Sequence, residues 1–180
     1  RKWNNLASQK NVPRFWASNF YFSAWKMGAW DYGIFDSDSN CDAWAEFYHS
    51  DDPVKKTISV LDEYVAGTPP SYIEVDEAGY IILSALLVIG FQNIDVIQEQ
   101  PVDIIPDYFK KQVVEVIHKH QSKYDESKNT KIGEHLIPQA SKICLNLVCS
   151  DAKKSELYDL WEESGAVEKW LAGMSFMVDL

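Results

Sequence analysis

Acidic side chains gather shortly before the first expected helix, at a spacing close to that of a calcium-binding loop. Asp36, Asp38 and Asn40 fill the first, third and fifth positions of such a loop. The sixth position requires glycine and holds Cys41, and the twelfth requires glutamate and holds Phe47. Because these two decisive positions fail, we expect the acids to cap a helix and not to bind Ca²⁺.

A second acidic stretch precedes the most apolar segment of the chain. Glu74, Asp76 and Glu77 stand where a helix is expected to begin, and carboxylates in a first turn interact favourably with the helix dipole. Glu77 has a second interpretation, since a carboxyl at the edge of a buried helix can have a raised pKa and act as a base. No histidine lies near it in sequence, so capping is the favoured role.

The histidines and cysteines do not form a recognisable metal or catalytic motif. His118 and His120 are two residues apart, which on a helix points them to different faces. Cys144 and Cys149, five residues apart, are equally unsuited to share a metal ion. The chain contains no HExxH, CxxC, GxSxG, Walker or Rossmann glycine pattern. We therefore assign no metal, no cofactor and no catalytic residue from the sequence.

An acidic and aromatic segment near the C-terminus offers a protein-binding surface. Trp161 is followed directly by Glu162 and Glu163, and Trp170 comes a few residues later. Exposed aromatic side chains beside carboxylates would suit a basic partner. In the alternative interpretation, which the sequence favours, both indoles belong to the core and the glutamates are simply solvated.

Charge is divided unevenly along the 180 residues. Residues 1–26 contain five basic side chains, seven aromatic ones and no acid. Since the whole chain has a net charge of −10, the remaining 154 residues carry −15. Such an acidic body argues against nucleic acid or an anionic membrane as partner and permits a basic protein. We expect a basic extension over 1–26 and one acidic domain over 27–180.

Hydrophobic periodicity predicts an all-α, single-domain bundle of six or seven helices. The central helix is expected over about 72–89, because this stretch is apolar almost all round in its second half. We expect a connection over 90–105 and an exposed loop over 124–133. The longest apolar run, 80–91, is shorter than the roughly 20 residues that span a bilayer. With three sparse cysteines and no signal-peptide pattern, the expected location is the cytoplasm.

The segment that opens the acidic domain carries a resemblance to a known family. From residue 27 it reads Met-Gly-Ala-Trp-Asp-Tyr-Gly-Ile-Phe-Asp-Ser-Asp. It resembles a bacterial family of unknown function whose members begin Met-Gly-x-Trp-Gly-x-Gly-x-Phe-Asp-x-Asp. Blocks at 72–78 and 155–165 fit the same family in the same order, whereas Asp31 departs from its usual glycine. The resemblance implies an α-helical bacterial protein that starts at Met27, and it implies no reaction.

Within this motif the residue types favour a structural role. We expect Gly33, like Gly28, to adopt a backbone conformation that other residues resist. Trp30 and Phe35 would anchor the segment on the bundle, and Asp36 or Asp38 would cap the first helix. The alternative is that the motif forms a ligand site.

Three functional hypotheses remain. The first is a non-enzymatic protein-binding domain, most specifically an immunity or antitoxin protein that masks a basic toxin. The second is an enzyme or small-ligand-binding protein that uses carboxylates such as Asp36, Asp38 and Glu77 in a pocket between helices. The third is that residues 1–26 regulate the acidic domain by covering its partner surface. The sequence does not indicate an oligomeric state.

Overall fold

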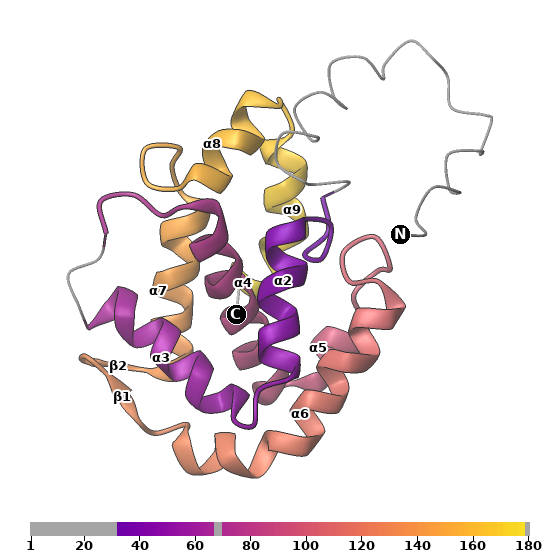
Figure 1. Cartoon of the computed structure of the whole chain (residues 1–180), viewed down its shortest axis with the longest axis vertical. Coiled ribbons are helices and arrows are strands. Elements are labelled where there is room, and N and C mark those ends of the chain that lie inside the picture. The colour runs from indigo at the N-terminus through magenta and orange to yellow at the C-terminus, as the bar shows by residue number, and fades with distance from the viewer. Residues whose placement is uncertain (1–31, 67–69, 179–180) are drawn as a thin grey trace.

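The computed structural model describes residues 32–66 and 70–178, and these residues form an all-α bundle with one pair of short strands (Figure 1). Each of the seven segments that show helical periodicity forms a helix, which confirms the predicted fold class. The eighth helix, α5, lies in the predicted connection over 90–105. In chain order the elements are α2 (Asp38–Tyr48), α3 (Pro53–Val65), α4 (Val75–Gln92), α5 (Ile94–Gln98), α6 (Asp107–Ser127), β1 (Lys131–Ile132), β2 (His135–Leu136), α7 (Ile137–Cys149), α8 (Glu156–Glu163) and α9 (Val167–Val178).

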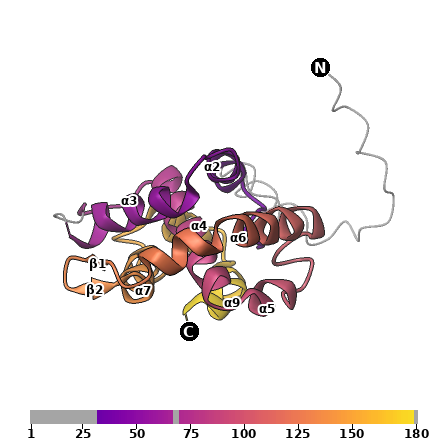
Figure 2. The ribbon, with the colours of Figure 1, turned by 90° about the horizontal axis from the view of Figure 1, so that it is seen from below.

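Helix α4 is the centre of the bundle, as the apolar stretch predicts. It contacts each of the other seven described helices. Seen from below, α2 and α3 lie on one side of it and α7 and α9 on the other (Figure 2). All residues from 81 to 91 are buried, so a helix that is apolar on every face is satisfied by neighbours on every face.

One helix of the described residues is long and apolar enough to cross a membrane by length and composition. It is α4, whose 18 residues have a mean hydropathy of 1.5, and 72% of that window is buried inside the bundle. A core helix passes the same test, so the result is weak support for a membrane span. Packing within the bundle accounts for the apolar composition.

The helix starts follow local sequence rules more closely than the loops do. Asp52 caps α3, since its carboxylate accepts a hydrogen bond from the Lys55 N–H at 3.0 Å and Pro53 is the first helical residue. For α2 the cap is Ser37, whose Oγ accepts from the Asn40 N–H at 3.3 Å. The prediction that Asp36 or Asp38 would cap α2 is therefore wrong, because the helix begins at Asp38 itself.

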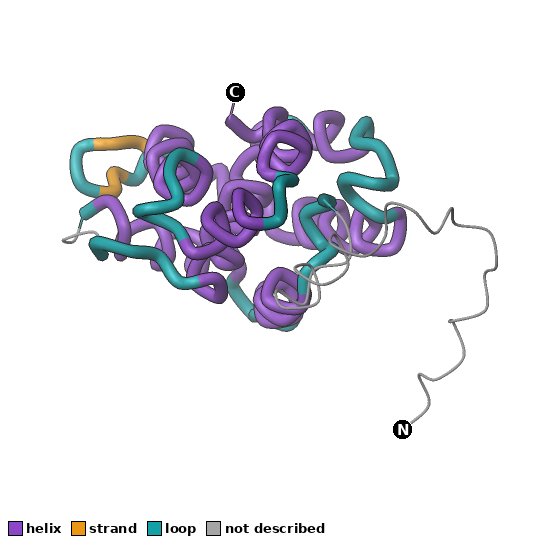
Figure 3. Tube along the Cα trace, turned by 90° about the horizontal axis from the view of Figure 1, so that it is seen from above, coloured by secondary structure: helices purple, strands orange, loops and turns teal. Residues whose placement is uncertain are grey.

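The predicted exposed loop over 124–133 is also corrected. Helix α6 continues to Ser127, and Tyr124 is buried with its ring stacked on Phe91 at a centroid distance of 4.7 Å. The following residues form the antiparallel pair β1–β2, which lies at one edge of the molecule (Figure 3) and buries Ile132. The polar residues of this stretch conceal two side chains that the fold buries, and strands of two residues are too short to show alternation.

Candidate functional site

The segment before α2 is a turn held against the loop that precedes α6. The Gly33 N–H donates to Asp36 Oδ2 at 2.9 Å, and the Ile34 N–H donates to the Ile104 carbonyl at 2.9 Å. Gly33 does not have a positive φ, so the expectation of an unusual backbone conformation there is wrong. Glycine is needed because a Cβ at this position would lie 2.6 Å from the carbonyl oxygen of Asp103.

Phe35 anchors this turn in the core, as the structural interpretation of the motif predicts. Its side chain is 2% exposed, stacks on Phe109 at 4.2 Å and meets the edge of Trp44 at 5.7 Å. Such aromatic pairs add about 0.5–1.5 kcal/mol each beyond area burial. Gly28 and Trp30, the other expected structural residues of the motif, lie outside the described residues.

The acidic side chains around α2 are not arranged to bind a cation. Among the described residues, no group of three or more His, Cys, Asp or Glu side chains is arranged to hold a metal ion. Asp38 is exposed in the first turn of α2. The Cys41 thiol donates to the Phe35 carbonyl at 3.2 Å. Burial first, and then Asp38, Asp36 and Asp42, raise its pKa to about 11, so it stays a protonated thiol at neutral pH.

Carboxylates close the N-terminus of α4, where capping was the favoured role. Glu77 Oε2 accepts from the Glu74 N–H at 2.9 Å, and Glu156 Oε2, from α8, accepts from the Val75 N–H at 2.9 Å. Asp76 Oδ1 accepts from a hydroxyl of α2 at 2.9 Å. Glu77 therefore bonds a backbone group that a helix leaves unpaired, a structural role for the residue considered as a base.

Both tryptophans near the C-terminus belong to the core. Trp161 and Trp170 are buried and lie parallel with their ring centroids 6.3 Å apart, and Tyr32 packs on Trp161 at 5.5 Å. Glu162 and Glu163 follow Trp161 on the exposed side of α8. Because both indoles are buried, neither tryptophan is available to a basic partner at the surface.

A different aromatic residue, Tyr72, lies on the surface beside the acids of α8. Backbone hydrogen bonds place it there, because the Ile73 N–H donates to the Lys154 carbonyl at 2.8 Å and the Glu156 N–H donates to the Ile73 carbonyl at 2.9 Å. This bridge between segments far apart in the chain has no signal in the sequence. Tyr72 remains 39% exposed.

We call Tyr72, Glu156, Asp159 and Glu163 the Tyr72 face. The pKa of Tyr72 is raised first by partial burial and then by the carboxylates of Asp159, Glu156 and Glu163. None of these three carboxylates forms an ion pair within the described residues, whose four ion pairs involve other acids. The nearest basic residues along the chain are Lys154, in the turn before α8, and Lys169, in α9, and both are exposed. The face combines unneutralised negative charge with an accessible aromatic ring.

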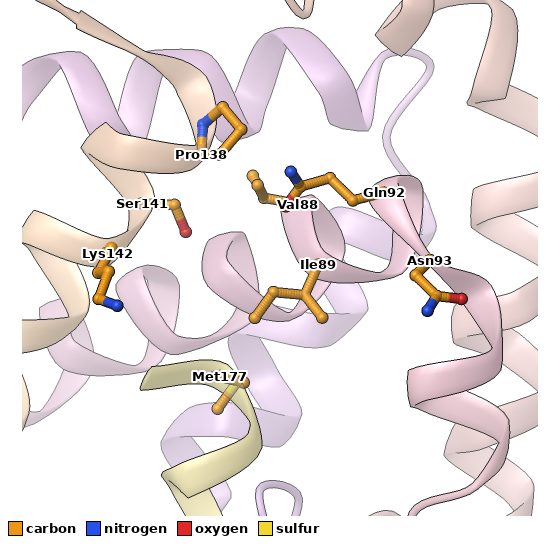
Figure 4. Close-up of a pocket in the computed structure, with 8 residues that line it drawn as sticks. All are labelled: Val88, Ile89, Gln92, Asn93, Pro138, Ser141, Lys142 and Met177. Atoms are coloured by element: carbon orange, nitrogen blue, oxygen red, sulfur yellow. The ribbon is translucent and has the colours of Figure 1, made fainter. Parts of the chain in front are cut away.

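The bundle also has a hollow of about 180 Å³ between α4, α7 and α9 (Figure 4). Asp36, Asp38 and Glu77, which the second hypothesis places in a pocket, do not line it, nor do they line two larger and more open hollows of about 480 and 370 Å³. The residues that line the smaller hollow are Val88, Ile89, Gln92, Asn93, Pro138, Ser141, Lys142 and Met177.

Comparison with known proteins yields one match. The model of a family described as a domain of unknown function (DUF4259) matches residues 28–173, from before the Gly33 turn into α9. Neither a curated protein nor a solved structure matches the chain.

Proposed function

Since the chain belongs to the DUF4259 family of domains of unknown function, we propose that it is a non-enzymatic protein-binding domain that receives a basic partner on the Tyr72 face. The most specific form of the proposal is a bacterial immunity or antitoxin protein that masks a basic toxin in the cytoplasm. The observation that carries it is an exposed tyrosine among three carboxylates that have no basic partner in the described residues.

The composition of the face suits an interface. Tyrosine is enriched among residues that dominate binding energy, because it offers a large ring with little conformational entropy to lose. The three carboxylates add attraction for a basic surface, and the charge of −15 on residues 27–180 strengthens that attraction. Long-range attraction of this kind raises association rates at low salt and weakens when salt screens it.

The carboxylates that the second hypothesis places in a ligand pocket have structural roles instead. Asp36 accepts a hydrogen bond within the Gly33 turn, and Glu77 closes the start of α4. Asp38 is exposed in the first turn of α2, where a carboxylate complements the helix dipole. These roles favour the protein-binding proposal over a carboxylate pocket.

An affinity pull-down from the source organism at low and high salt tests the proposal. The bait is the full chain, compared with the double variant Asp159→Asn/Glu163→Gln, which leaves the Glu156 cap intact. The control is Glu99→Gln/Glu134→Gln, which removes the same charge from exposed positions whose side chains form no hydrogen bond or ion pair in the described residues.

The proposal expects one stoichiometric basic protein that binds wild type and control, is lost at high salt and is depleted by the Tyr72-face variant. Exposed charge pairs contribute about 0.2–1 kcal/mol each, so the double variant should weaken binding about 2- to 30-fold. Equal capture by both double variants would refute the assigned surface. No basic partner at either salt would refute the proposed function itself.

A further inference from the structure

We propose that the hollow between α4, α7 and α9 is a binding site for a small organic carboxylate with a compact apolar group. This goes beyond the proposed function, because the hollow and the Tyr72 face share no residue. Figure 4 shows how three helices surround the space: Pro138, Ser141 and Lys142 come from α7, and Met177 comes from α9. Val88, Ile89 and Gln92 come from the end of α4, and Asn93 directly follows that helix.

The floor of the hollow is apolar. Val88, Ile89 and Met177 are almost completely buried, and Pro138 also lines the hollow. Burying the apolar group of a ligand against these apolar side chains removes it from water, which favours binding. A cavity of about 150 Å³ lined by aliphatic and aromatic side chains accommodates benzene, so about 180 Å³ suits a ligand slightly larger than one aromatic ring.

The rim supplies hydrogen-bond donors without partners of their own. Lys142 forms no ion pair or hydrogen bond in the described residues, and Ser141 is 97% buried yet its hydroxyl forms none either. Asn93 uses its Oδ1 to accept from the Asp95 N–H at 3.1 Å, which leaves its amide Nδ2 as a donor. Because Ser141 lines the hollow, its hydroxyl can donate a hydrogen bond to a ligand oxygen there.

Charge selects an anion for this rim. Lys142 is the one charged residue among the described lining residues, and no carboxylate stands with it. A carboxylate at the rim would receive a charge-assisted hydrogen bond from Lys142 and a neutral one from Ser141.

The test uses benzoate and its neutral analogue benzyl alcohol, titrated into the full ¹⁵N-labelled chain and followed by two-dimensional NMR. We expect benzoate to shift the amide signals of Asn93, Ser141 and Lys142, with a Kd on the order of 1 mM. Benzyl alcohol should bind about tenfold more weakly, because it lacks the charge that Lys142 recognises.

Lys142→Met should weaken benzoate about tenfold and leave benzyl alcohol unchanged, and this exposed position tolerates the change. Lys111→Met is the matched control, because it removes the same charge from a lysine that is exposed on α6 and forms no ion pair. It should bind benzoate like wild type. The proposal is overturned if benzoate shifts no lining residue at about 10 mM, or if the two lysine variants bind benzoate equally.

Discussion

Replacing Gly33 by alanine should destabilise the domain, because the turn before α2 leaves no room for a side chain. A Cβ there would lie 2.6 Å from the Asp103 carbonyl oxygen and 3.1 Å from that of Ile104. The second of these oxygens accepts the hydrogen bond from the Ile34 N–H at 2.9 Å. Since both obstacles are backbone atoms, the added methyl group must push two chain segments apart.

The expected loss can be worked out from three contributions. Forcing a methyl group into a filled site costs about 1–3 kcal/mol. Losing the Ile34–Ile104 hydrogen bond costs about 0.5–1.5 kcal/mol. Alanine also restricts the unfolded chain, which offsets about 0.4–1 kcal/mol. The net loss is about 2 kcal/mol, which for a domain of this size lowers Tm by about 4–8 °C.

Urea denaturation followed by tryptophan fluorescence measures this loss, because Phe35 of the turn contacts Trp44. Asparagine substitutions separate space from backbone conformation. At Gly165 φ is +73° and an added Cβ would meet no atom within 4 Å. Asparagine should lower the free energy of unfolding there by less than alanine does, because asparagine adopts a positive φ more readily. At Gly33 asparagine should cost at least as much as alanine. A Gly33→Ala protein as stable as wild type would refute the packing of this turn against the loop before α6.

Three further predictions concern the tail, a buried histidine and a helix cap. If residues 1–26 cover the partner surface, as the third hypothesis holds, deleting them should raise partner affinity; unchanged affinity by calorimetry discards a covering role. Burial first, and then Lys119 and Lys123, lower the pKa of His120 against the opposing effect of Asp52. The unfolded chain therefore binds this proton more readily, so the free energy of unfolding should fall as the pH drops through about 6.5. The fall should be smaller in His120→Gln, and an equal pH dependence of the unfolding free energies of wild type and variant contradicts this. The Ser155 hydroxyl accepts from the Tyr158 N–H at 3.3 Å, so Ser155→Ala should cost about 1 kcal/mol, with Ser155→Thr closer to wild type; no loss of Tm in the alanine variant would exclude the cap.

Local patterns explain how much of the fold the sequence predicts. Periodicity and caps act within a few residues, so the seven longer helices and the Asp52 cap were predictable. Helix α5 has five residues and is too short for a periodic signal. Tyr124 was misassigned because its burial depends on stacking with Phe91 across two helices, which a count of polar neighbours does not reveal.

The candidate site depended on contacts between distant segments. The sequence brings Glu163 to attention through its neighbour Trp161, and that tryptophan turns inward to pack on Trp170. The exposed ring is Tyr72, which reaches α8 through the bridge between Ile73 and Ser155. Pairing of this kind is set by tertiary packing, so the charges were visible in the sequence and their aromatic neighbour was not.

The most direct test of the proposed function is the affinity of two tyrosine variants for the captured basic partner. Tyr72→Ala removes the centre of the Tyr72 face, and Tyr108→Ala removes a tyrosine that is 68% exposed on α6. Calorimetry on the full chain should give a Kd about 30-fold weaker for Tyr72→Ala, which corresponds to about 2 kcal/mol, and little change for Tyr108→Ala. Equal Kd values for Tyr72→Ala and wild type would contradict the assignment of this face as the partner surface.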